Sequence, residues 1–304
     1  MLSLLTAFVM AWMSAGSPAW EAAQAAPPST DVFLADLGIK DGRITIGKPE
    51  NISNSPGYDN QPFFTPDGKA VLFTSDRTSS QMEIYRYDLQ SRRISRVTNT
   101  PESEYSPTVT PDSRHISVIR VEADGTQRLW KFTSEGKNPS LVLDEVKPVG
   151  YHAWLDESTL VLFVLGQQGQ PATLQVADVG TGHAEIVTKN IGQSIAKIPG
   201  DGVSFVQQEG EGDTRTLRIT SVRKEGGKVV TAPLTPAVAG ARQAHVAWTP
   251  DGTLLMAHDG TLHAWRKGES AWRAVADLTA LGLRNVTRLA VSPKGDRISI
   301  VAVP

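Results

Sequence analysis

Short stretches of alternating or continuous apolar residues recur along this chain at a nearly constant spacing. Clear examples are IYRYD from Ile84, LWKFT from Leu129, LQVAD from Leu174, LRITS from Leu217 and LHAWR from Leu262. Their first residues are 45, 45, 43 and 45 positions apart, and a sixth copy, VFLAD from Val32, lies 52 positions before the first. Each stretch has the length and pattern of a β-strand. A fixed period of this length predicts a repeat architecture.

A turn pattern recurs in step with these strands. It is carried by FFTPDGKAVLF from Phe63, TVTPDSRHISV from Thr108, AWTPDGTLLMA from Ala247 and AVSPKGDRISI from Ala290, with a degraded copy, AWLDESTLVLF, from Ala153. Pro presets φ, Asp bonds to nearby backbone, and Gly accepts positive φ, so PDG between two apolar stretches is typical of a tight turn. The repeat unit is therefore four antiparallel strands in about 45 residues, which is the blade of a β-propeller.

The two ends of the chain predict how the ring of blades closes. The C-terminal segment contains two strands, LAVSP and RISIVAVP, and the segment from Asp31 contains two more, DVFLADL and RITIGKPENI. Together these half-units complete one blade beside five full ones. We therefore predict an all-β fold, a six-bladed β-propeller over residues 31–304, with N- and C-terminal strands sharing one blade. A β-sandwich is the competing architecture, but the regular spacing does not follow from it.

The repeats resemble those of the TolB-like, WD-repeat-like propellers. The matching elements are TPDGK at residues 65–69, TSDR at 74–77, IYRYD from Ile84 and VTN at 97–99. The resemblance is strong in the first two units and weak between residues 155 and 240. It implies a six-bladed propeller but says little about function. TolB itself carries an α/β domain before its propeller, for which this sequence has no room, so we expect a relative and not TolB itself.

The first 26 residues differ from the rest. Residues 2–13 (LSLLTAFVMAWM) form an apolar run of the length of a signal-peptide core, and Ala23-Gln24-Ala25 is a small-x-small cleavage pattern. We expect a signal peptide over residues 1–25 and a linker over 26–30, although no Lys or Arg precedes the apolar run. A membrane anchor is the alternative. The expected location is the periplasm or the exterior of a bacterium, with no membrane span after cleavage.

Composition narrows the function classes. The formal net charge of -2 provides no basic field for nucleic acid, and the absence of cysteine excludes disulfides and thiolate chemistry. We find no metal-binding, phosphate-binding or nucleophile-elbow motif, and we expect no cofactor. His258 and His263 are able to face each other across a hairpin, but we expect rim residues there and not a metal site. Trp130, Trp154, Trp248 and Trp265 fall on strand positions and are expected to pack between blades.

The candidate site is the central mouth of the ring. The strand before each PDG turn is expected to be innermost, so the residues that precede it meet near the axis. The predicted binding set, drawn from five blades, comprises Asp59, Asn60, Gln61, Glu104, Tyr105, Tyr151, His152, Gln243, His245 and Arg288. Polar and aromatic groups that converge in this way are typical of a recognition site. Polar residues at strand entrances also satisfy backbone groups and channel water, which is the structural alternative.

Three functions remain open from the sequence. The favoured one is a monomeric binding module for an envelope protein, a peptide or a glycan. The alternative is an enzyme at the mouth, such as a lactonase or polysaccharide lyase with or without a metal. Its candidate catalytic residues are Glu104, Tyr105, His152, His245 and Arg288. Asp59 and Glu104 are the expected start of a carboxylate cluster. The third is a structural scaffold with a plugged mouth.

Overall fold

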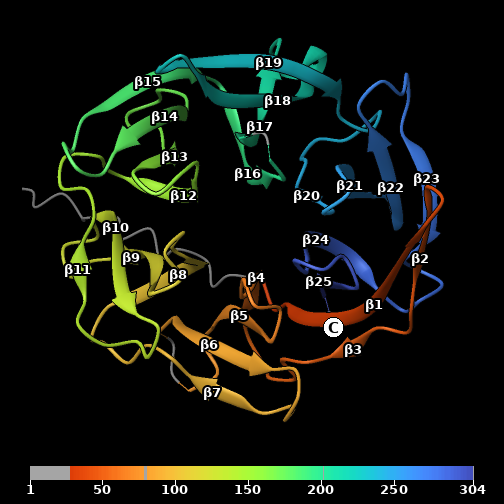
Figure 1. Ribbon diagram of the computed structural model, residues 1–304, viewed down its shortest axis with the longest axis horizontal. Coiled ribbons are helices and arrows are strands. Elements are labelled where there is room, and N and C mark those ends of the chain that lie inside the picture. Colours follow the sequence, from red (N-terminus) through yellow and green to blue (C-terminus); the bar gives the residue numbers. More distant parts are fainter. Residues whose placement is uncertain (1–27, 79–80, 201, 304) are drawn as a thin grey trace, which may run out of the picture.

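The computed structural model describes residues 28–78, 81–200 and 202–303. Six antiparallel sheets stand around a central axis, which Figure 1 views end-on. The all-β, six-bladed propeller is therefore confirmed. The expected signal peptide over residues 1–25 lies outside the described residues, as does the start of the linker. No helix in the described part of the chain is long and apolar enough to cross a membrane.

Each of the first five blades is a four-stranded sheet whose first strand is innermost. Blade one consists of β4 (Asp59–Phe64), β5 (Ala70–Ser75), β6 (Glu83–Asp88) and β7 (Ile94–Arg96). Blade two consists of β8 (Ser103–Val109), β9 (His115–Val121), β10 (Gln127–Thr133) and β11 (Ser140–Leu141). Blade three consists of β12 (Val149–Trp154), β13 (Thr159–Val164), β14 (Thr173–Asp178) and β15 (Ala184–Lys189).

Blade four consists of β16 (Ile191–Ile198), β17 (Gly202–Glu209), the 3-10 turn η1 (Gly212–Thr214), β18 (Thr216–Glu225) and β19 (Lys228–Pro236). Blade five consists of β20 (Val246–Trp248), β21 (Thr253–His258), β22 (Thr261–Arg266) and β23 (Arg273–Asp277). Blade four matches the sequence repeat least, yet its outer strands β18 and β19 span ten and nine residues. Gly226 and Gly227 join them with φ of 56° and 80°, as a two-residue hairpin turn requires.

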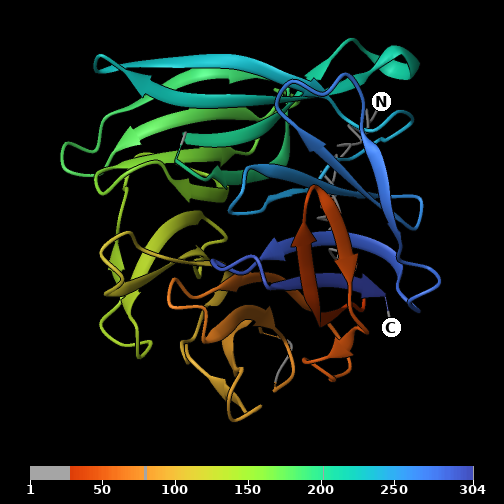
Figure 2. The same ribbon diagram turned by 45° about the vertical axis from the view of Figure 1, so that its right-hand side comes forward.

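The closing blade contains strands from both ends of the chain. Its order from the axis outward is β24 (Arg284–Val291), β25 (Arg297–Val303), β1 (Asp31–Lys40) and β2 (Arg43–Ile46), with the short β3 (Glu50–Asn51) also paired to β1. Val32 lies opposite Val301 in the β1–β25 ladder, and both are fully buried. Figure 2 shows these red-orange and blue strands together. Ring closure by the two ends is confirmed, with one strand more than the four expected.

The PDG turns are stabilised by side-chain hydrogen bonds within each turn. In blade one the Thr65 hydroxyl donates to the Asp67 carboxylate over 2.6 Å, and the backbone N–H of Lys69 donates to the same oxygen. Gly68 adopts φ of 67°, which favours glycine. Thr110 with Asp112, and Thr249 with Asp251, repeat the hydroxyl-to-carboxylate bond. These turns lie at the end of the inner strands opposite to the mouth.

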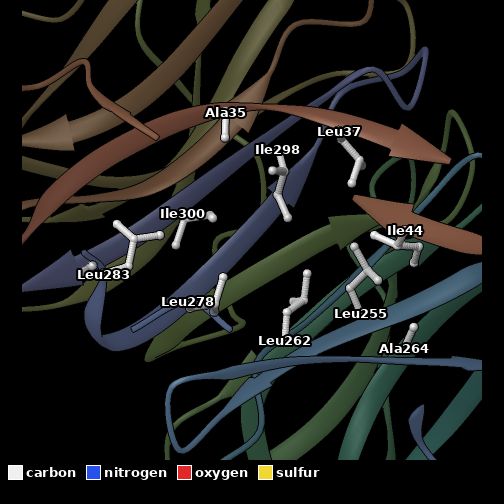
Figure 3. Packing of buried hydrophobic residues seen from close by; sticks show 11 residues of the cluster. Ala35, Leu37, Ile44, Leu255, Leu262, Ala264, Leu278, Leu283, Ile298 and Ile300 are labelled. Carbon is white, nitrogen blue, oxygen red and sulfur yellow. The ribbon is translucent and has the colours of Figure 1, made fainter. Parts of the chain in front are cut away.

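The hydrophobic core is divided among the interfaces between blades. The buried apolar side chains of the described residues form six clusters, each shared by two neighbouring blades. Figure 3 shows the cluster where Ile298 and Ile300 of the closing blade face Leu255 and Leu262 of blade five. All four of the expected packing tryptophans belong to such clusters. Because each sheet buries both faces against its neighbours, the ring must be complete to exclude water from all six interfaces.

Candidate functional site

The inner strands surround a pocket at the mouth of the ring, which we call the axial pocket. It has a volume of about 140 Å³ and receives residues from all six blades. Its lining comprises residues 61–63 of β4, 106–108 of β8, 151–152 of β12, 193–195 of β16, 245–246 at the start of β20, and 288–289 of β24. Five members of the predicted set therefore meet here, namely Gln61, Tyr151, His152, His245 and Arg288.

Irregular strand pairing turns these side chains toward the axis. In β4, β8, β12, β16 and β24 the register with the second strand of the blade shifts close to the mouth. Gln61 and Ser106 occupy equivalent positions in two such shifts, and both adopt positive φ, of 57° and 53°. A β-bulge adds a residue to one strand and re-aims the side chains beside it. The mouth is therefore formed by the same local distortion repeated from blade to blade.

Arg288 provides the positive charge of the axial pocket. Its Nη2 donates to the Tyr151 hydroxyl over 2.8 Å, and its guanidinium lies 4.8 Å from the centre of the Tyr151 ring. No Asp or Glu lines the pocket, and Arg288 makes no ion pair within the described residues. The tyrosine thus fixes the position of the guanidinium without neutralising it, and several of its five N–H donors remain available.

The two histidines of the pocket are neutral at ordinary pH. Burial lowers the pKa of His152 to about 3. Burial and the nearby charge of Arg288 lower the pKa of His245 to about 3 as well. The Nε2 of His152 is hydrogen-bonded to the Ser117 hydroxyl at 2.7 Å, while its Nδ1 has no partner among the described residues. Arg288 is therefore the charged group of a pocket that is otherwise polar and neutral.

Gln61 connects blade one to blade two. Its Oε1 accepts hydrogen bonds from the Thr74 hydroxyl and from the backbone N–H of Ser106, each over 2.8 Å. The Ser106 hydroxyl is buried and finds no partner in the described part of the chain, although Ser106 lines the pocket. Gln61 consequently has a structural task besides its place in the lining, whereas the Ser106 hydroxyl is a buried polar group beside the pocket.

The other predicted residues lie outside the axial pocket. Asp59 is buried with its carboxylate 2.9 Å from Arg77, and Asn60 is buried with its amide donating to Thr30. Glu104 is buried with its Oε1 3.0 Å from Nε of Arg120. The two carboxylates are thus each paired with their own arginine, and neither lines the pocket with the histidines. This arrangement differs from the carboxylate cluster expected for an enzyme.

Tyr105 is half-buried and packs against the cluster between blades two and three. It nevertheless lies near the mouth, because the next residue, Ser106, lines the axial pocket. Burial raises the pKa of Tyr58, the Arg288 charge opposes this, and Tyr151 and Tyr105 reinforce it. Tyr58 therefore belongs to the surroundings of Arg288, although the sequence did not single it out. Its position just before Asp59 was the available signal.

A second hollow on the mouth face, which we call the radial groove, extends outward over blade four. It has a volume of about 340 Å³ and contains Gln243, the remaining predicted residue. Gln193 and His245 line both hollows, so the groove and the axial pocket are adjacent. Arg215 and Arg242, which the sequence analysis did not single out, line the outer part. They lie where the repeat is weakest, so alignment of the blades gave no indication of them.

A metal site is not indicated by the geometry. Among the described residues no three His, Asp or Glu side chains are grouped as metal ligands. His258 and His263 are not directly opposite each other, since His258 pairs with Thr261 and His263 with Met256. His258 instead contacts Asp259 at 3.3 Å.

Comparisons with known proteins were made for sequence and for fold. No family model matches the chain. An uncharacterized protein of Agrobacterium fabrum is 26% identical over 81 residues, which cover 27% of this chain and 27% of that protein. The match therefore spans about a quarter of the length of this curated relative.

Solved structures cover much more of the chain. A putative TolB from Agrobacterium tumefaciens superimposes with a TM-score of 0.65 at 16% identity, over 90% of this chain and 98% of that one. TolB from Acinetobacter baumannii gives 0.55 at 12% identity, over 90% of this chain and 64% of that one. An oligogalacturonate lyase in complex with manganese gives 0.54 at 13% identity, covering 84% and 81%. The protein thus has the fold of the TolB-like six-bladed propellers, as its repeats indicated.

Proposed function

We propose that this propeller is an exported binding module that captures a protein, peptide or glycan of the cell envelope at its mouth. The observation that carries the proposal is the lining of the axial pocket. Six blades bring together two neutral imidazoles, a tyrosine, and a guanidinium that has no carboxylate partner among the described residues. Such convergent polar groups around an aromatic ring are suited to hold and orient a ligand.

The same lining gives less support to an enzyme. Glu104 and Tyr105, two of the five candidate catalytic residues, do not line the pocket that contains His152, His245 and Arg288. Of the groups that do line it, His152 is hydrogen-bonded through its Nε2 to the hydroxyl of Ser117, which is itself fully buried. Acid–base catalysis is most efficient with a group whose pKa lies near the operating pH. Burial instead lowers the pKa of both histidines of the pocket to about 3, which favours binding over catalysis.

Site-specific photo-crosslinking tests the proposed face. The photoreactive residue p-benzoylphenylalanine is introduced in place of Gln193, which is exposed and lines both hollows, in the full chain expressed in its host. The matched control carries it in place of Arg114, an exposed residue in a turn at the opposite end of the inner strands. We expect a defined adduct from position 193 and none from position 114. Adducts only from position 114, or the same adducts from both, would show that the mouth is not the binding face.

A further inference from the structure

The axial pocket and the adjacent radial groove together present three arginine side chains. Arg288 lies at the axial end, and the exposed side chains of Arg215 and Arg242 line the outer part. Within the described part of the chain, no Asp or Glu lines either hollow. None of the three arginines makes an ion pair within the described residues, whereas Arg77, Arg120 and Arg128 elsewhere in the propeller each have a carboxylate partner. In a chain of net charge -2, this local excess of positive charge is suited to an anionic ligand.

The shape of the site favours a chain end at the axis. The axial pocket is enclosed by six strands and holds about 140 Å³, which accommodates a terminal group and not a chain that passes through. The guanidinium of Arg288 is held by Tyr151, so it is already oriented before a ligand arrives. Arginine presents a planar fork of donors that matches the two oxygens of a carboxylate. A terminal carboxylate therefore fits the axial end.

The lining of the radial groove favours a peptide over a sugar chain. Its lining includes the apolar side chains of Val206, Leu217 and Phe163 together with the amides of Gln208 and Gln243. Amide groups are able to bond to an extended backbone, while the apolar surface accommodates its side chains. Phe163 is the aromatic ring of this lining, and it packs edge-on against Tyr151 with ring centres 5.7 Å apart. Sugar rings often stack on aromatic side chains, and the described lining of the groove contains one Phe and no Tyr or Trp.

We propose that the site binds the C-terminal end of an extended acidic peptide, with the terminal carboxylate on Arg288 and preceding acidic side chains at Arg215 and Arg242. This inference rests on the proposed function, because it places the ligand at the mouth. It adds the ligand's chemical class, its direction and a second subsite over blade four.

The probe is a pool of fluorescein-labelled hexapeptides with acidic residues at two internal positions and a free C-terminal carboxylate. The matched pool is amidated at the C-terminus, and trigalacturonate serves as an anionic sugar competitor. Binding to the protein without residues 1–25 is followed by fluorescence anisotropy. We expect the amidated pool to bind about tenfold to a hundredfold more weakly, because one charge-assisted hydrogen-bonded pair is lost.

Variants assign this difference to residues. Arg288→Gln should remove the preference for the free carboxylate, and Arg288→Lys, which keeps the charge but not the fork, should retain part of it. Arg242→Gln should weaken binding of both pools by a similar factor. Arg284→Gln is the matched control, because Arg284 is exposed on the same strand and lines neither hollow. Melting temperatures of all variants are compared with the wild type to exclude unfolding.

Two sets of results would overturn the inference. Equal binding of the two pools, no binding of either, or an unchanged preference in Arg288→Gln would refute recognition of a terminal carboxylate. Displacement of the peptides by trigalacturonate at lower concentration than by unlabelled peptide would identify an anionic glycan as the ligand instead. In each of these cases an adduct from position 193 alone would still support the mouth as the binding face, so failure of this inference is distinguishable from failure of the proposed function.

Discussion

Two buried glutamates at the contact between blades one and two make the stability of the propeller dependent on pH. Glu83 of β6 and Glu104 of β8 are both fully buried. The Oε1 of Glu83 is bound by Arg96, and the Oε1 of Glu104 by Arg120 and Thr100. The second oxygen of each, Oε2, finds no donor among the described residues. Two ionised carboxylates would therefore each leave a buried oxygen unsatisfied, which a proton on one of them relieves.

Burial and the adjacent Glu83 raise the pKa of Glu104 to about 8, against the opposing effects of the Thr100 hydrogen bond and the Arg120 charge. In the unfolded chain a glutamate titrates near its ordinary pKa of 4.5. Between these two values the folded state binds more protons than the unfolded state, so the free energy of unfolding falls as pH rises. The slope is about 1.4 kcal/mol per pH unit. Between about pH 5.5 and pH 7.5 the expected loss from Glu104 is about 2 to 3 kcal/mol.

Glu104→Gln tests this reasoning, because the amide copies the protonated acid in shape and hydrogen bonding but does not titrate. Urea unfolding followed by tryptophan fluorescence gives the free energy of unfolding at both pH values. Relative to wild type, the variant should gain about 2 to 3 kcal/mol on going from about pH 5.5 to pH 7.5. Other titrating groups, including the buried histidines, are common to both proteins and cancel in this difference.

Glu102→Gln is the control, because Glu102 lies 3.8 Å from the same arginine, Arg120, but is partly exposed. Its pH profile should run parallel to that of the wild type. A Glu104→Gln profile that is also parallel to wild type would refute a proton shared by the buried pair.

Three further predictions concern packing and export. Ser117→Ala should lower the free energy of unfolding, measured by urea titration, by about 1 to 3 kcal/mol, and by more than Ser204→Ala does. The reason is that Ser117 bonds to both an indole and an imidazole, whereas Ser204 bonds to an indole alone among side chains. Equal losses in the two variants would contradict this. Ile300→Ala should lower the free energy of unfolding by about 2 to 5 kcal/mol, because Ile300 is fully buried in the closing blade. Ile186 is 58% exposed, so Ile186→Ala should stay within about 0.5 kcal/mol of wild type. Similar losses at both positions would argue against closure of the ring through this cluster. N-terminal sequencing of protein from the periplasmic fraction should find a mature chain that starts just after Ala25, and an intact leader in the membrane fraction would refute cleavage.

The place of the candidate site was predictable from the sequence, but its members were predictable only in part. Aligning the units on their PDG turns located the mouth, and Gln61, Tyr151, His152, His245 and Arg288 do line the axial pocket. The same alignment included Asp59 and Glu104, which are instead buried in ion pairs. Their partners, Arg77 and Arg120, are 18 and 16 residues further along the chain. The register of β8 with β9 places Arg120 opposite Glu104, and Arg77 follows the end of β5, where Ser75 pairs with Asp59. A shift of one residue in register reverses the face to which a side chain points, and nothing local in the sequence specifies that shift.

The number and spacing of the blades follow from local features of the sequence. They depend on the strand period and on turns such as Thr65-Pro66-Asp67-Gly68, in which neighbouring residues satisfy each other. The half-units at the two ends predicted closure of the ring, which is made by the distant pairing of β1 with β25. The tertiary structure alone decided which polar groups face the axis and where the radial groove lies. Both depend on bulges and on loops from three different blades, and the packing energies that select them arise between residues far apart in the chain. Arg215 and Arg242 therefore became candidates only once blade four was seen beside its neighbours.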